Sequence, residues 1–288
     1  NDPNSISVPV IAIDSDTSDH FGKTALLKVH VEGFELNVLK GATELLATAP
    51  HPIVQVKLTD DRLERYGVSR HDIFDFLKVE NGIPLFIEDH MVRFQNSAKE
   101  MGLTLGYSVK GLKKFVMKLI AKNEFKKGGM KIILTGGYSA NGYLPAKESN
   151  MIILLTHFKV PSKKVFAKGV KLMLHEHFRH SAFVKTTNYI EPIRLANDLK
   201  KANALDVLYH WDGKISESSR ANFFIVKKDK TIVTSTSHVL KGITRKRVMN
   251  LAKEHYKVVE KDITFRDLKD ATEAFLSSTT KGTLPVVQ

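Results

Sequence analysis

The sequence predicts an α/β protein of the α+β type, and three observations support this class. Apolar positions repeat at helical spacing in several segments, apolar runs of strand length lie between them, and consecutive strands in the second half are joined by tight turns. Hydrophobic residues make up 42% and charged residues 26% of the 288 residues, which is the balance of a globular protein. No apolar run approaches the ~20 residues that span a bilayer, so we expect no membrane partner.

The first 70 residues are expected to form three strands and one helix. Apolar runs predict strands over 8–13, 25–31 and 53–58. Four leucines share one face between 34 and 47, and this spacing predicts a helix.

The following segment, up to residue 158, combines two helices with strands. Apolar spacing predicts helices over 87–101 and 109–122 and strands over 130–134 and 151–158. The apolar segment 72–79 fits a strand or a helix, because a run this short does not distinguish them.

The second half predicts consecutive hairpins rather than a regular alternation of strands and helices. A linker is expected over 158–163, where Pro and Lys interrupt the periodic pattern. Hairpins are predicted over 204–215, through an Asp-Gly turn, and over 222–235. A helix opened by a glycine is predicted over 243–255, followed by a strand over 274–277.

The charge of the chain is positive and unevenly distributed. Lys plus Arg number 44 and Asp plus Glu 31, a formal net charge of +13. Residues 1–65 hold 10 acids and 6 bases, a net charge of −4, so the remainder carries +17. The lysines occur as scattered pairs without a base-stacking aromatic motif, and we expect no nucleic-acid partner. Cysteine is absent, which excludes disulfides and thiolate chemistry and fits a cytoplasmic location.

Two turns carry groups that suit an anion. Gly242-Ile243-Thr244 opens a predicted helix, whose free backbone N–H groups form an anion cradle. The turn 277–280 follows a predicted strand and consists of four hydroxyl residues. The pair indicates one phosphate held from two sides, and ordinary polar loops are the alternative.

Two charged residues adjoin apolar segments. Lys185 follows Ala182-Phe183-Val184, and an apolar setting lowers the pKa of an amine and makes it nucleophilic. Glu217 follows the Asp-Gly turn and precedes an apolar strand. A solvated lysine and a solvent-facing acid are the alternatives.

Three histidines, His175, His177 and His180, raise the question of a metal site. His175 and His177 would share one face of a strand, but their spacing is not the His-Glu-x-x-His of helical zinc sites. Surface histidines are the commoner case, so we expect no metal.

Four motifs occur in the order and spacing of the class IV aminotransferases, which are fold-type IV pyridoxal-phosphate enzymes. The motifs are Lys185-Thr-Thr-Asn-Tyr189, Gly213-Lys-Ile-Ser-Glu-Ser-Ser-Arg-Ala-Asn222, Leu240-Lys-Gly-Ile-Thr-Arg245 and Phe275-Leu-Ser-Ser-Thr-Thr280. The segment Pro84–Ala98 resembles a helix of the family's small domain. The resemblance covers about Asp72 to Gln288 and implies pyridoxal phosphate as cofactor.

The resemblance also implies a role for each matching residue. Lys185 would form the Schiff base and then move the proton between the substrate Cα and the cofactor's C4′. Glu217 would face the pyridine nitrogen, and Tyr189 the ring hydroxyl. The remaining roles are phosphate binding by Arg93, Ile243, Thr244 and Thr279, contact with the substrate carboxylate at Thr280 and Lys281, and a place in the pocket wall for Tyr138.

The family's activity implies the substrates and the assembly. The reaction would move an amino group between an amino acid and a 2-oxo acid, of the branched-chain or the D-amino-acid type, in a homodimer. A pyridoxal-phosphate lyase of the aminodeoxychorismate type is the alternative reaction.

The N-terminal segment resembles a different family. Ala25–Ala42 is similar to the late part of FkbM-type methyltransferases, although His30 stands where that family has Asp and its glycine-rich cofactor loop is absent. Methyl transfer is therefore not expected. We predict three parts: 1–70 as the methyltransferase-like fragment, 71–158 as a small domain whose first strands are replaced, and 159–288 as the pyridoxal-phosphate domain. Because those strands are replaced, a fusion without catalytic activity is the further alternative.

Overall fold

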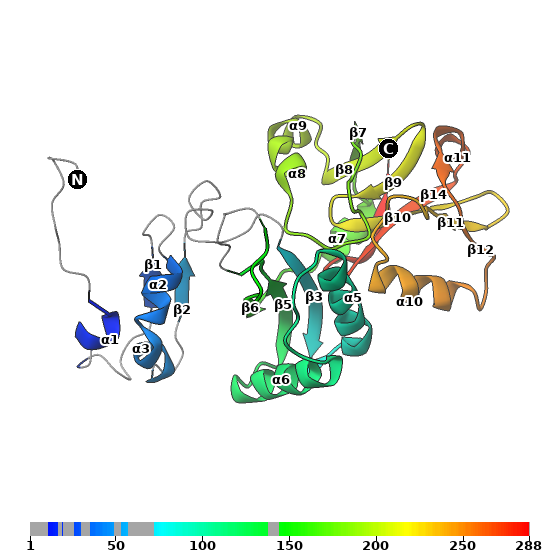
Figure 1. Ribbon diagram of the computed structural model, residues 1–288. Helices are drawn as coiled ribbons and strands as arrows, with labels where there is room; N and C mark the ends of the chain where they lie inside the picture. The colour runs from blue at the N-terminus through cyan, green and yellow to red at the C-terminus, as the bar shows by residue number, and fades with distance from the viewer. Residues whose placement is uncertain are drawn as a thin grey trace, which may run out of the picture. The chain divides into compact units, whose positions relative to one another are not determined.

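The computed structural model describes residues 11–16, 19, 26–29, 35–48, 53–56, 72–137 and 144–287 (Figure 1). The chain divides into two compact units. One unit comprises Asn1–Arg70 with Gly136–Ala146, and the other His71–Thr135 with Lys147–Gln288.

The first unit contains short helices and a parallel pair of strands within its described residues. Its elements are α1 (Ile13–Asp16), β1 (Leu26–Val29), α2 (Glu35–Lys40), α3 (Thr43–Thr48) and β2 (Ile53–Val56). Strands β1 and β2 pair in parallel, which confirms the cores of two predicted strands. The strand predicted over 8–13 is wrong at its end, where α1 begins, and residues 8–10 lie outside the described part.

The single helix predicted over 34–47 is also wrong, because the structure has two helices separated at Gly41-Ala42. The carboxylate of Asp14 accepts hydrogen bonds from the backbone N–H groups of Glu44 and Leu45, each at 2.9 Å. A carboxylate in this position caps a helix start. The second helix therefore begins where Asp14 reaches it, which spacing along one segment does not show.

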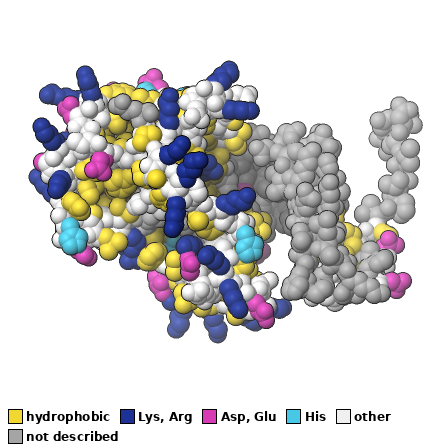
Figure 2. Space-filling model, turned by 180° about the vertical axis from the view of Figure 1, so that it is seen from behind, with side chains coloured by type: hydrophobic (Ala, Val, Ile, Leu, Met, Phe, Trp, Pro, Cys, Tyr) yellow, Lys and Arg dark blue, Asp and Glu magenta, His cyan; other side chains and the backbone are white. Residues whose placement is uncertain are grey.

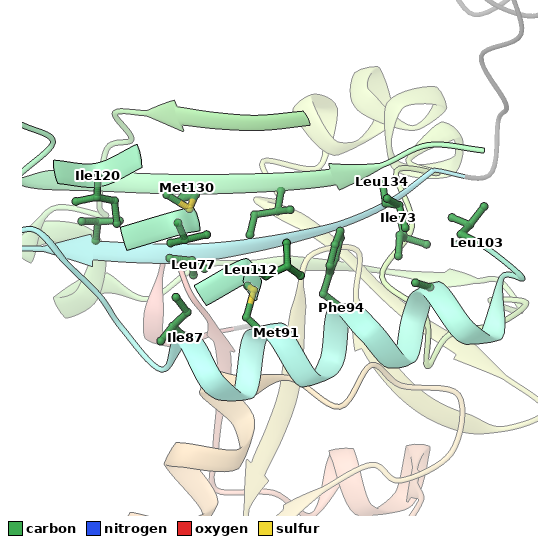
Figure 3. Packing of buried hydrophobic residues seen from close by; sticks show 14 of the residues in the cluster. Ile73, Leu77, Ile87, Met91, Phe94, Leu103, Leu112, Ile120, Met130 and Leu134 are labelled. Atoms are coloured by element: carbon green, nitrogen blue, oxygen red, sulfur yellow. The ribbon is translucent and has the colours of Figure 1, made fainter. Parts of the chain in front are cut away.

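The second unit begins with a four-stranded antiparallel sheet, here called the small sheet. Its strand order is β4-β3-β5-β6, and α5 and α6 cover one face (Figures 1 and 3). The bounds are β3 (Ile73–Glu80), β4 (Ile83–Pro84), α5 (Ile87–Glu100), α6 (Val109–Lys122), β5 (Lys127–Leu134) and β6 (Met151–Thr156). Both helices and both predicted strands are confirmed, and segment 72–79 is a strand.

Alternation along β3 explains how the small sheet holds its helices. Ile73 and Leu77 point to the helix side, where they pack with Met91 and Phe94 of α5 (Figure 3). All four side chains are fully buried. The intervening residue Asp75 points to the same side and is buried as well, so this strand places a carboxylate beneath α5.

The rest of the unit is built on a nine-stranded sheet, here called the large sheet. Its main order is β12-β11-β10-β9-β8-β7, with β13 beside β9, and β14 between β10 and β15. The strands are β7 (Leu172–Glu176), β8 (Asp206–Trp211), β9 (Lys214–Ser218), β10 (Ala221–Val226), β11 (Ile232–Thr234), β12 (Val258–Glu260), β13 (Ile263–Thr264), β14 (Glu273–Ser278) and β15 (Gly282–Val286). The hairpins β8–β9 and β10–β11 confirm both predicted hairpins.

Short helices join the strands of the large sheet. They are α7 (Lys163–Lys168), α8 (Ile190–Arg194), α9 (Ala196–Lys201), α10 (Ile243–Ala252) and α11 (Phe265–Lys269). The linker prediction over 158–163 is wrong at its last residue, where α7 begins with Ser162 as its cap. Helix α10 confirms the prediction at its start and ends three residues earlier than expected.

Basic side chains are dispersed over the visible face of the second unit and alternate with hydrophobic and polar ones (Figure 2). Within the described ranges, no helix has the length and apolar character needed to cross a membrane. The division at residue 158 stays a prediction. The small and large sheets fall on either side of it.

Candidate active site

A cavity of about 310 Å³ lies in the second unit and brings Arg93 of α5 together with residues of the large sheet and its connecting segments. The seven residues assigned by resemblance to catalysis or cofactor binding all line it: Arg93, Lys185, Tyr189, Glu217, Ile243, Thr244 and Thr279. Thr280 and Lys281 do not line it. Tyr138 lies outside the described residues.

The position of Lys185 is fixed from both sides along the chain. The preceding Val184 is buried in the core that α5 and α6 form with the small sheet. The carbonyl of Lys185 accepts a hydrogen bond from the backbone N–H of Phe74 at 2.8 Å, and the N–H of Thr187 donates to the carbonyl of Asp72 at 2.9 Å. These bonds align the segment after Val184 with β3 and direct the lysine side chain into the cavity.

The Lys185 amine lies in a desolvated and electropositive position. Its Nζ is 4.6 Å from the centroid of the Phe74 ring. Burial, together with the positive charge of Arg93, lowers the pKa of Lys185 to about 8. An amine with this pKa carries an appreciable neutral fraction near neutral pH, and the neutral form is the nucleophile and the base.

Glu217 is a buried carboxylate on β9, held by three donors. Asn222 Nδ2 donates to Oε2 at 2.8 Å and the backbone N–H of Leu240 to Oε1 at 3.1 Å, while Arg179 forms an ion pair with Oε1. Burial raises the pKa of Glu217 to about 7, and Arg179 opposes that rise. The site therefore holds a buried carboxylate, and this carboxylate titrates near neutral pH.

The first turn of α10 also lines the cavity. Gly242 precedes the helix, and a Cβ at this position would lie 2.1 Å from Oδ1 of Asn222. Only glycine therefore allows this close approach. Ser277 on β14 also lines the cavity, and its buried Oγ has no hydrogen-bond partner among the described residues. Such a group calls for a ligand at this end.

Arg93 reaches the cavity from α5 and is held by the carboxylate beneath that helix. Its Nε lies 3.0 Å from Oδ2 of Asp75 and its Nη2 2.7 Å from Oδ1. The same Oδ1 lies 2.7 Å from Nδ1 of His90. Burial would raise the pKa of Asp75, but Arg93 and His90 outweigh it and hold the pKa well below its usual range. Asp75 thus orients the arginine and stays ionised.

Replacing Asp75 with asparagine is expected to destabilise the protein by about 3–5 kcal/mol, because one partner of a buried ion pair is removed. The depressed pKa of Asp75 means that the pair contributes above its ordinary pKa of 3.8 and is lost as the pH falls below it. Urea unfolding at pH 7 measures the first effect, and the change in unfolding free energy between pH 4 and pH 2 measures the second. Glu80→Gln, at an exposed ion pair on the same strand, is the matched control, and an equal loss in the two variants would contradict the prediction.

The cavity rim near α8 carries aromatic and imidazole groups. The Tyr189 ring lies 6.2 Å from the Phe74 ring, and burial raises the pKa of Tyr189. His175 Nε2 lies 2.6 Å from Oε1 of Glu191 on α8, and burial lowers the pKa of its neighbour His177. Among the described residues, no group of three or more His, Cys, Asp or Glu is placed to hold a metal ion.

Several residues of the site were missed by reasoning from the sequence: Asp75, His90, Arg179 and Asn222. The signal for Asp75 was available, since a strand that alternates apolar residues toward its helices also points this acid inward, and a buried acid needs a cationic partner. Arg179 and His90 gave no such signal, because their partners are distant in sequence.

The fold and the cavity can now be compared with known proteins. The model of the amino-transferase class IV family matches residues 72–288. The chain belongs to this family. The class IV aminotransferases use pyridoxal phosphate, so this is the cofactor of the chain. The model of the methyltransferase FkbM domain matches residues 1–95 and agrees with the resemblance of the first segment.

Relatives of this class IV aminotransferase include D-alanine aminotransferases. The one from Bacillus licheniformis is 25% identical over 232 residues, covering 79% of this chain and 81% of the relative. The one from Staphylococcus aureus strain N315 is 29% identical over 224 residues, covering 75% and 78%. Both alignments extend over most of the two proteins.

Solved structures show the same fold. A putative 4-amino-4-deoxychorismate lyase from Legionella pneumophila has a TM-score of 0.70 at 24% identity, covering 80% of this chain and 86% of that one. The branched-chain amino acid aminotransferase of Escherichia coli has a TM-score of 0.68 at 23% identity, covering 75% of this chain and 76% of that one. The fold is that of the fold-type IV pyridoxal-phosphate enzymes.

Proposed function

We propose that this class IV aminotransferase moves an amino group between an amino acid and a 2-oxo acid, with Lys185 as the residue that binds pyridoxal phosphate covalently. One observation carries the proposal. A buried amine of lowered pKa, a buried carboxylate and a helix start with a free hydroxyl beside it line one cavity. These are the partners required by the aldehyde, the ring nitrogen and the phosphate of the cofactor.

The groups at the phosphate end fit an anion of this size. Backbone N–H groups at the start of α10, with Ile243 and Thr244, would bind phosphate oxygens, and Thr279 would add a hydroxyl. Arg93 supplies a positive charge whose orientation Asp75 fixes. Ser277 of the hydroxyl turn 277–280 would supply a further donor, because its Oγ has no hydrogen-bond partner among the described residues.

The proton chemistry is assigned to the residues at the other end. Pyridoxal phosphate, when bound, supplies an electron sink for the pair left on the substrate Cα. Lys185 Nζ takes the Cα proton, for which its lowered pKa suits it, since a base near the working pH is efficient. Glu217 would present its carboxylate to the ring nitrogen, and Tyr189 would place its hydroxyl at the cavity wall.

The names of the relatives suggest the class of substrate. We assign a D-amino acid of the alanine type as first candidate, because D-alanine aminotransferases match four-fifths of the chain, and a branched-chain amino acid as second. Thr280, Lys281 and Tyr138 stay proposed contacts of the substrate carboxylate and pocket wall. A homodimer in the cytoplasm is proposed as well, and exposed Ile152 and Leu154 on β6 offer apolar surface for a second copy.

The proposal is tested by incubating the purified protein with pyridoxal phosphate, removing free cofactor and recording the near-ultraviolet and violet spectrum. We expect a retained band that D-alanine shifts, together with pyruvate formation that depends on an added 2-oxo acid. Pyruvate released from aminodeoxychorismate without any 2-oxo acid would assign the lyase reaction instead. A folded protein that retains no band would favour the fusion without catalytic activity.

A further inference from the structure

The two elements that we assign to the phosphate are separate helices with a groove between them. Arg93 comes from α5, and Ile243 and Thr244 come from the first turn of α10. A cavity of about 660 Å³ runs between the helices and shares Arg93, Gly242 and Ile243 with the active-site cavity. Apolar packing therefore does not close the space behind the phosphate end, and another contact must fix the distance between the helices.

Asp89 provides that contact. It lies one turn before Arg93 on α5, and its Oδ1 accepts a hydrogen bond from Lys246 Nζ of α10 at 2.8 Å. Its Oδ2 is bound by Arg247. The Arg247 guanidinium also lies over the ring of Phe86, the residue before α5, at 4.3 Å from the centroid. Two cationic side chains of α10 thus bind one carboxylate at the start of α5.

This ion pair lies one helical turn from the active site on both helices. The backbone N–H of Lys246 donates to the carbonyl of Gly242 at 3.0 Å, so it belongs to the same turn as Ile243 and Thr244. The hydrogen bonds from Lys246 and Arg247 keep the pKa of Asp89 lowered despite partial burial, so the carboxylate is ionised at neutral pH. A shift of Asp89 relative to Lys246 would change the separation of Arg93 from the helix start.

We propose that Asp89 is a positioning residue for the cofactor's phosphate group. It ties α5 to α10 and so sets the distance between Arg93 and the N–H groups of Ile243 and Thr244. Asp89 does not line the active-site cavity and acts through these residues. The inference rests on the proposed function, since it requires the phosphate to bind at this end.

The test compares pyridoxal phosphate with pyridoxal, which lacks the phosphate. For Asp89→Asn we expect about fivefold weaker binding of pyridoxal phosphate and unchanged binding of pyridoxal, both measured by absorbance titration. Asp89→Glu is expected to retain wild-type affinity. Glu88→Gln is the matched control, because Glu88 is on the same turn but pairs with Lys113 of α6, away from α10.

The outcomes distinguish a failure of the role assigned to Asp89 from a failure of the proposed function. Equal weakening of both ligands would show a general structural role, and unchanged affinity would show none, so either result overturns the proposal. If Asp89→Asn does not fold, the double variant Lys246→Gln and Arg247→Gln removes the same contact from α10 and is expected to give the same selective loss. A wild-type protein that retains no pyridoxal phosphate overturns the proposed function and this inference with it.

Discussion

Replacing Lys185 with alanine is expected to lower kcat of transamination by about 10⁴-fold or more and to remove the retained absorbance band. The variant lacks the amine to which we assign both the covalent bond to the cofactor and the transfer of the proton. The structure offers no substitute, since Lys185 is the lysine that lines the cavity among the described residues. Stopped assays with D-alanine and 2-oxoglutarate measure the loss.

The matched control for Lys185→Ala is Lys131→Met. Lys131 lies on β5 with its Nζ 4.8 Å from the centroid of the same Phe74 ring, and burial lowers its pKa as well. It does not line the cavity, so this variant is expected to keep the band and the turnover. Turnover near the wild-type level in Lys185→Ala would assign the chemistry to another group and contradict the proposed function.

Glu217→Gln is expected to lower kcat by about 10²- to 10³-fold while cofactor is still retained. The amide preserves the size of the side chain and removes the carboxylate that we propose faces the ring nitrogen. It also leaves the Arg179 guanidinium without its carboxylate, so a lower melting temperature is expected as a separate effect.

Two measurements check Glu217→Gln: a titration that gives the affinity for the cofactor, and an assay that gives kcat in enzyme saturated with cofactor. A large loss of kcat with nearly unchanged affinity supports a role in the chemistry, because the phosphate end still binds the cofactor. Glu176→Gln, at an exposed position on β7, is the control for removing one acid from the large sheet. Loss of affinity without loss of kcat in saturated enzyme would contradict the assigned role.

The candidate site could be predicted from the sequence only where a residue belongs to a recognisable local motif. Lys185, Glu217 and the start of α10 stand in such motifs, and the structure brings them into one cavity. Asp75 and Arg179 have partners 18 and 38 residues away, so no local spacing relates them. Their positions depend on which strand lies beneath which helix, and that is set by tertiary packing.

The same distinction applies to the fold. Helices α5 and α6 have 14 residues each, and their repeated apolar faces predicted them almost to the residue. Helices α7, α8, α9 and α11 have five or six residues, too few for an apolar repeat to be visible. Side chains of Ser162 and Thr264 cap the starts of α7 and α11, whereas α8 and α9 begin without a side-chain cap. The break at Gly41-Ala42 has a similar cause, since Asp14 reaches it from another helix.

Asn222 joins Glu217 to the segment before α10 through one side chain. Its Nδ2 donates to Glu217 and to the carbonyl of Leu240, while its Oδ1 lies where any side chain at position 242 would have to go. A side chain at position 242 therefore requires Asn222 to move, and that movement would disturb the hydrogen bond from Asn222 to the carboxylate of Glu217. We therefore expect substitutions at positions 217, 222 and 242 to be coupled, so that a change at one is tolerated only with changes at the others.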